Sequence, residues 1–243
     1  MRRAFVVADI HGCNRTFRQL LFNNIKLEKE DTIYLLGDYV DRGPDSKGVI
    51  DSILELKRKG FDIIPIKGNH EDMLLESINT SPDGQNYDWL EATLRSYRVK
   101  YPRDIPDDHL KMLETLPLYV ETEKHLLVHA GLNFSLDDPI TETSKECMLW
   151  NRKSQRVNPD KIGGKKIVVG HTMVTLDVIK KSIHADQIQL DNGCCMGKGV
   201  EGKGNLIALE LNSGDIFVQK NIERHSFSIF SNQTSFFNFF NKK

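Results

Sequence analysis

The stretch that decides the fold lies at residues 4–12 and reads Ala-Phe-Val-Val-Ala-Asp-Ile-His-Gly. Its first five residues are apolar and include two valines, which is the length and composition of a buried strand. Two residues that can bind a metal, Asp9 and His11, follow where the apolar run stops. If the strand end stays extended, both side chains project to the same face. Functional groups at the carboxyl ends of strands are typical of open α/β folds.

Four further apolar runs end in polar clusters of the same kind. The runs cover residues 32–36, 62–66, 125–128 and 166–169, and the clusters that follow them lie at 37–43, 68–71, 129–131 and 170–172. A single cluster of this type would be an ordinary loop. Five clusters with compatible side chains are hard to explain as independent turns, so we expect them to form one site.

The order of elements predicts two kinds of sheet pairing. Strands at 4–8, 32–36 and 62–66 alternate with helices near 14–23 and 46–58, and this βαβαβ order implies neighbouring parallel strands. The last two strands are expected to form a hairpin, because residues 212–215 read as a turn. From residue 118 onward strands dominate, and we expect them at 118–122, 125–129, 166–170, 187–191, 205–211 and 216–221.

A chain of 243 residues is most simply one domain with a substantial core. We assign residues 1–222 to a catalytic domain, within which residues 72–117 read as a helical insertion beside the site. Residues 223–243 form a tail that is either a loose terminus or a segment through which the protein self-associates. Six phenylalanines stand in this tail: Phe227, Phe230, Phe236, Phe237, Phe239 and Phe240.

Composition excludes several classes of partner. The formal net charge of -1 gives no general attraction to nucleic acid or to an anionic membrane. Every apolar run is far shorter than the ~20 residues that span a bilayer, and the first one does not resemble a secretory signal. We therefore expect a cytoplasmic protein. The adjacent Cys194 and Cys195 are expected to be reduced, because neighbouring cysteines bridge only with strain.

The polar clusters contain donors for two divalent metal ions. Carboxylate, imidazole and amide groups together suit a transition metal. A single histidine at a strand end is more often structural, but the joint pattern reverses that expectation. Two ions that share a carboxylate lie roughly 3.5–4 Å apart and clamp the oxygens of a phosphoryl transfer. We assign one ion to Asp9, His11 and Asp38, and the other to Asp38, Asn69, His129 and His171.

Two residues between the predicted ligands suit proton transfer. His70 is adjacent to a ligand but would point in a different direction, so it is the natural general acid for the departing oxygen. Asp41 can accept a hydrogen bond from the other ring nitrogen of His70 and so fix its tautomer. Glu71 is expected to favour the first turn of the following helix rather than to take part in chemistry.

Two arginines are candidates for binding phosphate. Arg42 carries the planar, two-pronged donor group that matches phosphate oxygens. Arg152, which follows Trp150 and Asn151, could supply a second clamp, although on spacing alone it reads equally well as a surface arginine. We place Asn69 with them as a phosphate-binding residue.

These residues resemble the phosphoprotein phosphatase family of calcineurin-like metallophosphoesterases, over residues 4 to about 221. Five motifs stand in the family's order: Asp-x-His-Gly, Gly-Asp-x-Val-Asp-Arg-Gly, Gly-Asn-His-Glu, His-Ala-Gly and Gly-His-Thr. The resemblance implies an α+β fold of four layers (α/β/β/α), in which a sandwich of two mixed sheets is flanked by helices. It also implies the ligand assignment above, His70 and Asp41 as a catalytic pair, and Arg42 and Arg152 as phosphate binders.

The implied reaction is hydrolysis of phosphoserine or phosphothreonine in a protein or peptide. The family carries it out by direct attack of a metal-bridging hydroxide, with His70 as general acid and no phosphoenzyme. The chain looks most like bacterial and phage members, for which manganese is the usual ion, with iron or zinc as alternatives. Lys67 stands where eukaryotic relatives usually have arginine.

Two other functions remain open on the sequence. One is hydrolysis of dinucleoside polyphosphates such as diadenosine tetraphosphate. Relatives that split this compound symmetrically generally lack an acid at the position of Asp41, so its presence favours phosphomonoesters without excluding nucleotides. The other is a non-catalytic pseudophosphatase that only binds phosphoproteins, and the retention of His70, Asp41 and Arg42 argues against it.

Overall fold

The computed structural model describes residues 2–80, 88–152 and 156–223. One sheet contains β1 (Ala4–Val7), β2 (Thr32–Leu35), β3 (Asp62–Pro65), β8 (Asn205–Glu210) and β9 (Ile216–Lys220). The other contains β4 (Tyr119–Glu121), β5 (His125–Val128), β6 (Lys166–Val169) and β7 (Gln187–Gln189). Each of these strands lies within two residues of its predicted range.

Both sheets are mixed, as predicted. In the first, the strand order is β3-β2-β1-β8-β9, with β1, β2 and β3 parallel and the β8–β9 hairpin antiparallel. In the second, β5, β6 and β7 are parallel and β4 is an antiparallel edge strand. The parallel pairing places the carboxyl ends of β1, β2 and β3 at one edge, and those of β5 and β6 meet them there.

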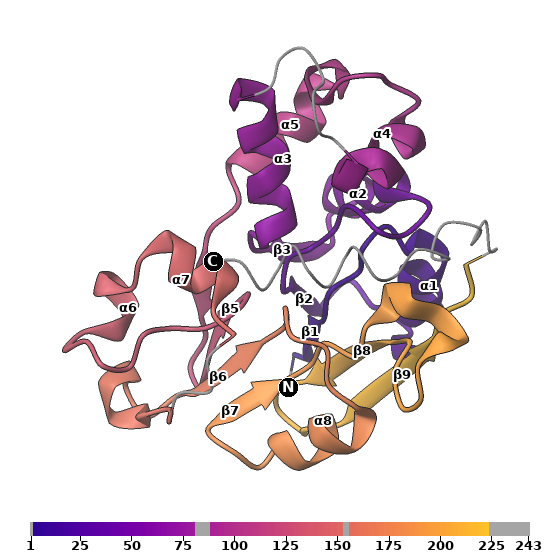
Figure 1. The fold of residues 1–243 in the computed structure, drawn as a ribbon. Coiled ribbons are helices and arrows are strands. Elements are labelled where there is room, and N and C mark those ends of the chain that lie inside the picture. Colours follow the sequence, from indigo (N-terminus) through magenta and orange to yellow (C-terminus); the bar gives the residue numbers. More distant parts are fainter. Residues whose placement is uncertain (1, 81–87, 153–155, 224–243) are drawn as a thin grey trace.

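The alternation of side chains along the strands explains the layers. Phe5 and Val7 on β1 pack into a cluster with the helices, whereas Val6 packs between the two sheets. Leu127 of β5 and Val168 of β6 join Val6 from the opposite sheet. Because neighbouring residues of a strand face opposite sides, both faces of each sheet are covered. The predicted four-layer arrangement of helices and two mixed sheets is confirmed (Figure 1).

The helices before residue 118 lie where the sequence predicted helical segments, whereas those after it were not predicted. Helix α2 has the predicted bounds, and the side chain of Asp45 caps it by accepting from the N–H of Gly48. The helices before residue 118 are α1 (Asn14–Gln19), which continues as the π-helix η1 (Leu20–Ile25), α2 (Ser46–Arg58), α3 (Asn69–Thr80), η2 (Asp88–Leu90), α4 (Glu91–Tyr97), η3 (Pro102–Asp104) and α5 (Asp107–Glu114). Those after it are α6 (Pro139–Glu142), α7 (Lys145–Trp150), η4 (Pro159–Ile162), α8 (Leu176–Ser182) and η5 (Cys194–Gly199).

The helices of the predicted insertion share a core with the rest of the molecule. Leu74, Leu94 and Leu113 belong to the same buried cluster as Phe17 and Val49. Helix α4 packs against α2 and α3 packs against α5, so these helices extend the main core rather than forming one of their own (Figure 1). Residues 81–87 of the predicted insertion and the phenylalanines of the tail lie outside the described residues.

The helices and the cysteines agree with the expectations from composition. The helices in the part of the chain described here are too short or too polar to span a membrane. The four cysteines are free, as expected for Cys194 and Cys195, and both of these are buried.

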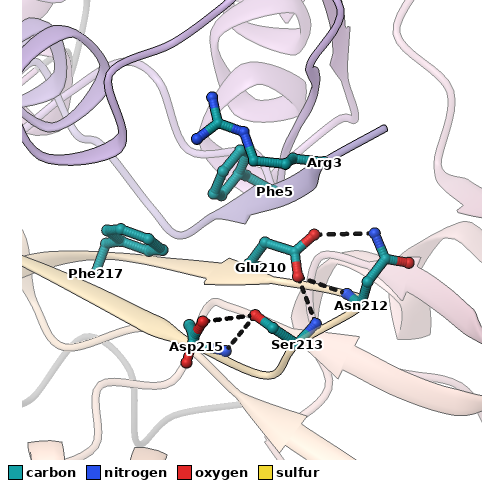
Figure 2. Close-up of a pocket in the computed structure, with 7 residues that line it drawn as sticks. All are labelled: Arg3, Phe5, Glu210, Asn212, Ser213, Asp215 and Phe217. Carbon is teal, nitrogen blue, oxygen red and sulfur yellow. Dashed lines mark hydrogen bonds between the residues drawn. The ribbon is translucent and has the colours of Figure 1, made fainter. Parts of the chain in front are cut away.

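The surface is hollowed at the end of β1 that lies away from the polar clusters. A pocket of about 490 Å³ opens there, lined by Arg3, Phe5, Glu210, Asn212, Ser213, Asp215 and Phe217 (Figure 2). Its charged groups already have partners. Glu210 accepts from the backbone N–H groups of Ala4 and Asn212, and Arg3 pairs with Asp31 at 2.6 Å. These groups hold the β8–β9 hairpin against β1, so the pocket gives no reason to infer a ligand site.

Candidate metal centre and active site

The five polar clusters meet where the strand ends of the two sheets converge. The N–H of His11 donates to the backbone oxygen of Asp38 at 2.7 Å, and the N–H of His70 donates to its Oδ1 at 3.1 Å. From the other sheet, the N–H of His171 donates to Oδ2 of Asp9 at 3.0 Å. Loops far apart in the sequence are thus bonded to one another, and the predicted site residues are brought together.

One group of donor atoms converges on a single point. Nε2 of His129 and Nδ1 of His171 each lie 2.9 Å from Oδ1 of Asn69 and 3.1 Å from each other. Nδ1 of His129 faces the backbone oxygen of Leu36 at 2.7 Å, so that nitrogen carries the proton and Nε2 presents a lone pair. Oδ1 of Asn69 presents lone pairs to the same point. Lone pairs that face each other at this distance repel unless a cation lies between them.

The carboxylate of Asp38 completes this group. Its Oδ1 lies 3.5 Å from Nε2 of His129, and the donor atoms of Asp38, His129 and His171 all lie within 4.8 Å of one another. Nε2 of His171 is buried without a hydrogen-bond partner. Two imidazoles, an amide oxygen and a carboxylate are the ligands that a divalent transition metal prefers, so these residues fit such an ion.

A second group of donor atoms shares Asp38. The donors of His11, Asp38 and His70 also lie within 4.8 Å of one another. Nδ1 of His11 faces the backbone oxygen of Val40 at 2.9 Å, which leaves its Nε2 as a lone pair 3.4 Å from Oδ2 of Asp38. The two groups are consistent with a binuclear metal centre in which Asp38 lies between the ions.

The predicted ligand Asp9 stands outside both groups. Its carboxylate lies against the backbone of the loop after β6, and a Cβ added at Gly170 would come within 2.1 Å of its Oδ1. The backbone at His11 is also not extended as we predicted, since its φ is 45°. The expectation that both side chains project to one face of an extended strand end therefore does not hold, because the backbone turns at His11.

A buried carboxylate that sequence analysis missed, Asp191, lies close to Asp9. Burial, followed by the charges of Asp191 and Asp38, raises the pKa of Asp9 well above its usual value. Burial likewise raises the pKa of Asp191 to about 6, against the lowering effect of the Gly193 N–H. Cations relieve such repulsion between buried acids. The signal was weak, because the strand before Asp191 alternates glutamine with apolar residues, unlike the apolar run before Asp9.

Backbone strain is concentrated in the same loops. Seven non-glycine residues among those described have a positive φ, and five of them lie in the polar clusters: His11, Asp38, Asp41, Arg42 and His171. Such conformations cost of order 1–3 kcal/mol each and persist where the surrounding structure enforces them.

Glu71 has a larger part than its predicted one at the start of a helix. Its side chain is 0% exposed, and its carboxylate accepts from the N–H groups of Asp38 at 2.8 Å, Tyr39 at 2.7 Å and Gly68 at 3.0 Å. Burial and the charge of Asp38 raise the pKa of Glu71 to about 7, while the N–H donors act in the opposite direction. Glu71 therefore ties the loop that carries Asp38 to the loop that carries Asn69.

His70 and Asp41 form the hydrogen bond expected of an acid and its partner. Nδ1 of His70 lies 2.7 Å from Oδ2 of Asp41, so Nδ1 carries the proton and Nε2 points to the site. Burial lowers the pKa of His70, but the charges of Asp38 and Asp41 outweigh it, and the net pKa is raised. Nε2 accepts from the Arg42 guanidinium in this structure, and the raised pKa favours uptake of the second proton that a general acid requires.

The predicted phosphate-binding arginines lie beside this pair. The Arg42 guanidinium is 3.0 Å from Nε2 of His70 and 2.7 Å from Nε2 of His11. Arg152 is more exposed, and partial burial followed by the charge of Arg42 lowers its pKa, so the two guanidinium groups lie near each other. Two cations facing a carboxylate-lined centre can bind an anionic substrate.

Comparison with known proteins supports a common origin for this arrangement. The model of the family described as calcineurin-like phosphoesterase matches residues 2–196. The chain is 31% identical over 158 residues to a symmetrical bis(5'-nucleosyl)-tetraphosphatase of Wigglesworthia glossinidia brevipalpis, covering 63% of this chain and 54% of that protein. The chain thus spans about half the length of the symmetrical relatives it matches.

Two other similarities extend over more of the chain. An asymmetrical bis(5'-nucleosyl)-tetraphosphatase of Geobacillus thermodenitrificans is 28% identical over 217 residues, covering 79% of this chain and 86% of that protein. The structure of a serine/threonine phosphatase from Saccharomyces cerevisiae superposes with a TM-score of 0.61 at 20% identity, covering 93% of this chain and 82% of that one. At that identity the superposition bears on the fold alone.

Proposed function

Because the chain belongs to the calcineurin-like phosphoesterase family, we propose that it is a metal-dependent hydrolase of bis(5'-nucleosyl) tetraphosphates. The observation that carries this proposal is the position of Asp38, which is common to both groups of donor atoms. The pair formed by His70 and Asp41 lies directly beside it. Relatives matched over much of their length supply the substrate class.

The residues that would hold the ions follow from the donor geometry. His11 and Asp38 face one position, with Asp9 behind them, and Asp38, Asn69, His129 and His171 face the other. Two bound divalent cations would polarise the phosphoryl oxygens and lower the pKa of water at the site. We propose manganese, with iron or zinc as alternatives, because the mixed nitrogen and oxygen donors suit all three.

The side chains around the metal positions would handle the substrate and the proton. Arg42 and Arg152 would bind phosphoryl oxygens, and Asn69 would contact the same group while serving as a ligand. His70 would donate a proton from Nε2 to the departing oxygen, while Asp41 holds Nδ1 and so keeps the ring in its orientation.

We further propose that cleavage occurs away from the centre of the tetraphosphate chain. The asymmetrical relative is matched over 86% of its length and the first symmetrical one over 54%. The resemblance in sequence implies that symmetrical enzymes generally lack an acid at the position of Asp41, so Asp41 sets this chain apart from them, although by itself it favours phosphomonoesters. Hydrolysis off centre yields a nucleoside triphosphate and a monophosphate, whereas hydrolysis at the centre yields two diphosphates.

Analysis of the products tests this proposal. The protein is incubated with diadenosine tetraphosphate and manganese, and the nucleotides are separated by anion exchange. We expect ATP and AMP in equal amounts at early times. ADP as the sole initial product would contradict off-centre cleavage, and an intact substrate would contradict the substrate class.

A serine/threonine protein phosphatase is the second candidate, and the His70–Asp41 pair favours it. A serine alkoxide is a far poorer leaving group than a nucleotide phosphate, so a well-positioned acid matters most for phosphoserine. We expect kcat/KM for a phosphoserine peptide to be lower than that for diadenosine tetraphosphate. The reverse order would make protein phosphatase the main function. Binding of both substrates without hydrolysis of either one would instead indicate a pseudophosphatase.

A further inference from the structure

Thr93 makes an unexpected contact with the catalytic pair. It lies on α4, in the helical region after residue 72, and stands 52 positions from Asp41 in the sequence. Its side chain is fully buried. Thr93 belongs to none of the five polar clusters, so no pattern in the sequence connects it with the site.

The hydroxyl of Thr93 engages Asp41 twice. Its Oγ1 accepts from the backbone N–H of Asp41 at 2.9 Å, and the same hydroxyl donates to Oδ1 of the Asp41 carboxylate. Since that proton is used, Oγ of Ser46, which lies 3.2 Å from Oγ1 of Thr93, is the donor between the two hydroxyls. Thr93 thus both donates to Asp41 and accepts from it, and the Oγ of Ser46 also accepts from the Asp41 N–H at 3.1 Å.

Both oxygens of the Asp41 carboxylate are consequently fixed. Oδ2 accepts from Nδ1 of His70 at 2.7 Å, and Oδ1 accepts from Thr93. Asp41 also has a φ of 69°, a strained conformation for a residue with a Cβ, and its N–H needs partners to hold it. Without the Thr93 hydroxyl, Oδ1 would lose its buried partner, and the carboxylate could rotate away from His70.

Helix α4 is firmly held in the orientation that this contact requires. Leu94 packs in the main core, and Oγ of Ser96 accepts from the N–H of Lys47 at the start of α2. Thr93 and Ser96 are three residues apart, so they face the same side of the helix. The helix thus directs two hydroxyls at the segment from Asp41 to Lys47.

From this geometry we propose that Thr93 is a positioning residue that orients Asp41 and, through it, His70. The inference rests on the proposed function in one respect, which is that His70 must be the acid for Thr93 to affect turnover. The positioning itself can be measured without the reaction. Helix α4 would then act as a support for the proton donor.

The test compares variants of the full chain loaded with zinc for NMR and with manganese for kinetics. Thr93→Val keeps the shape but removes the hydroxyl, and Thr93→Ser keeps the hydroxyl. Thr80→Val, at an exposed helical position, is the matched control. The NMR signal of the Nδ1–H proton of His70 is identified by its loss in His70→Asn.

We expect Thr93→Val to shift or abolish the His70 signal. It should also lower kcat for diadenosine tetraphosphate about tenfold with little change in KM. This loss is smaller than the roughly 10²–10⁴-fold effect of losing a general acid, because the acid itself remains. Thr93→Ser should restore both. An unchanged His70 signal in Thr93→Val would overturn the inference, whatever happens to kcat. If Thr93→Val does not fold, Thr93→Ala is read by the same two criteria.

The two proposals fail in different ways. A His70→Asn variant with normal turnover would refute the role of His70 in the proposed function, while the NMR signal would still decide whether Thr93 positions the ring. A shifted His70 signal together with an unchanged kcat in Thr93→Val would show that Thr93 positions the ring but that His70 is not the general acid.

Discussion

At the scale of single residues, Asp38 depends on neighbours that fix it from several sides. Burial raises its pKa, but the basic side chains around it, His129, His70, His11 and Arg42, outweigh burial and hold the pKa well below its usual value. Its backbone is left-handed, with a φ of 52°. A carboxylate kept charged in a buried and strained loop is suited to binding cations, and it needs support to remain there.

Glu71 supplies that support, and its replacement should be costly. In Glu71→Gln an NH₂ group faces backbone N–H donors, so a buried donor loses its acceptor. We expect the free energy of unfolding to fall by about 1–3 kcal/mol in urea titrations. The exposed Glu76→Gln on the same helix is the matched control. A Glu71→Gln variant as stable as that control would show that these bonds contribute nothing.

At the scale of elements, the histidines after β1, β5 and β6 are buried as neutral rings. Burial is the largest cause that lowers the pKa of His11, of His129 and of His171, the last to about 2. Below pH 6.5 the unfolded chain therefore binds more protons at these positions than the folded one. Their contribution to stability falls as the pH is lowered. The buried acids Glu71 and Asp191 have raised pKa values and act in the opposite direction.

A comparison of variants isolates the histidine contribution. For EDTA-treated protein, we expect the slope of the unfolding free energy against pH to be smaller in His171→Gln than in the parent. Between pH 5 and 6.5 the two slopes should differ by up to about 1.4 kcal/mol per pH unit. Urea titrations at several pH values supply the slopes. Parallel curves for the two proteins would mean that His171 titrates in the folded state as it does when unfolded.

The sequence predicted the strands better than the other elements, for a physical reason. Five of the strands, β1, β2, β3, β5 and β6, are short runs of mostly apolar residues that end at a polar cluster, and that pattern is local. Helices α6, α7 and α8 span only four to seven residues, too few for a helical period to appear. Thr93 was missed because its role comes from a tertiary contact with Asp41. Glu71 was placed on the correct helix, but its bonds reach the loop after another strand.

At the scale of the whole molecule, the metal centre exists only when the two sheets pack together. His11, Asp38 and Asn69 come from the first sheet, whereas His129 and His171 come from the second. The donor atoms therefore come together only when the two sheets are packed against each other. Bound cations should stabilise the protein by linking its halves.

Acid should inactivate the protein through loss of metal. Protons compete with cations for the imidazoles, but the pKa values of His11, His129 and His171 are lowered in the fold, so activity should fall only below the usual titration range of histidine. Raising the manganese concentration at an acid pH where half of the activity is lost should restore much of the rate, as measured with diadenosine tetraphosphate. Failure of manganese to restore activity, with the fold intact by circular dichroism, would assign the loss to another titrating group.

The central claim is that Asp38 lies between two cations. An anomalous difference map from crystals soaked in manganese tests it most directly. We predict two peaks in contact with Asp38, one beside His11 and the other among Asn69, His129 and His171. A single peak, or two peaks that Asp38 does not join, would contradict the account.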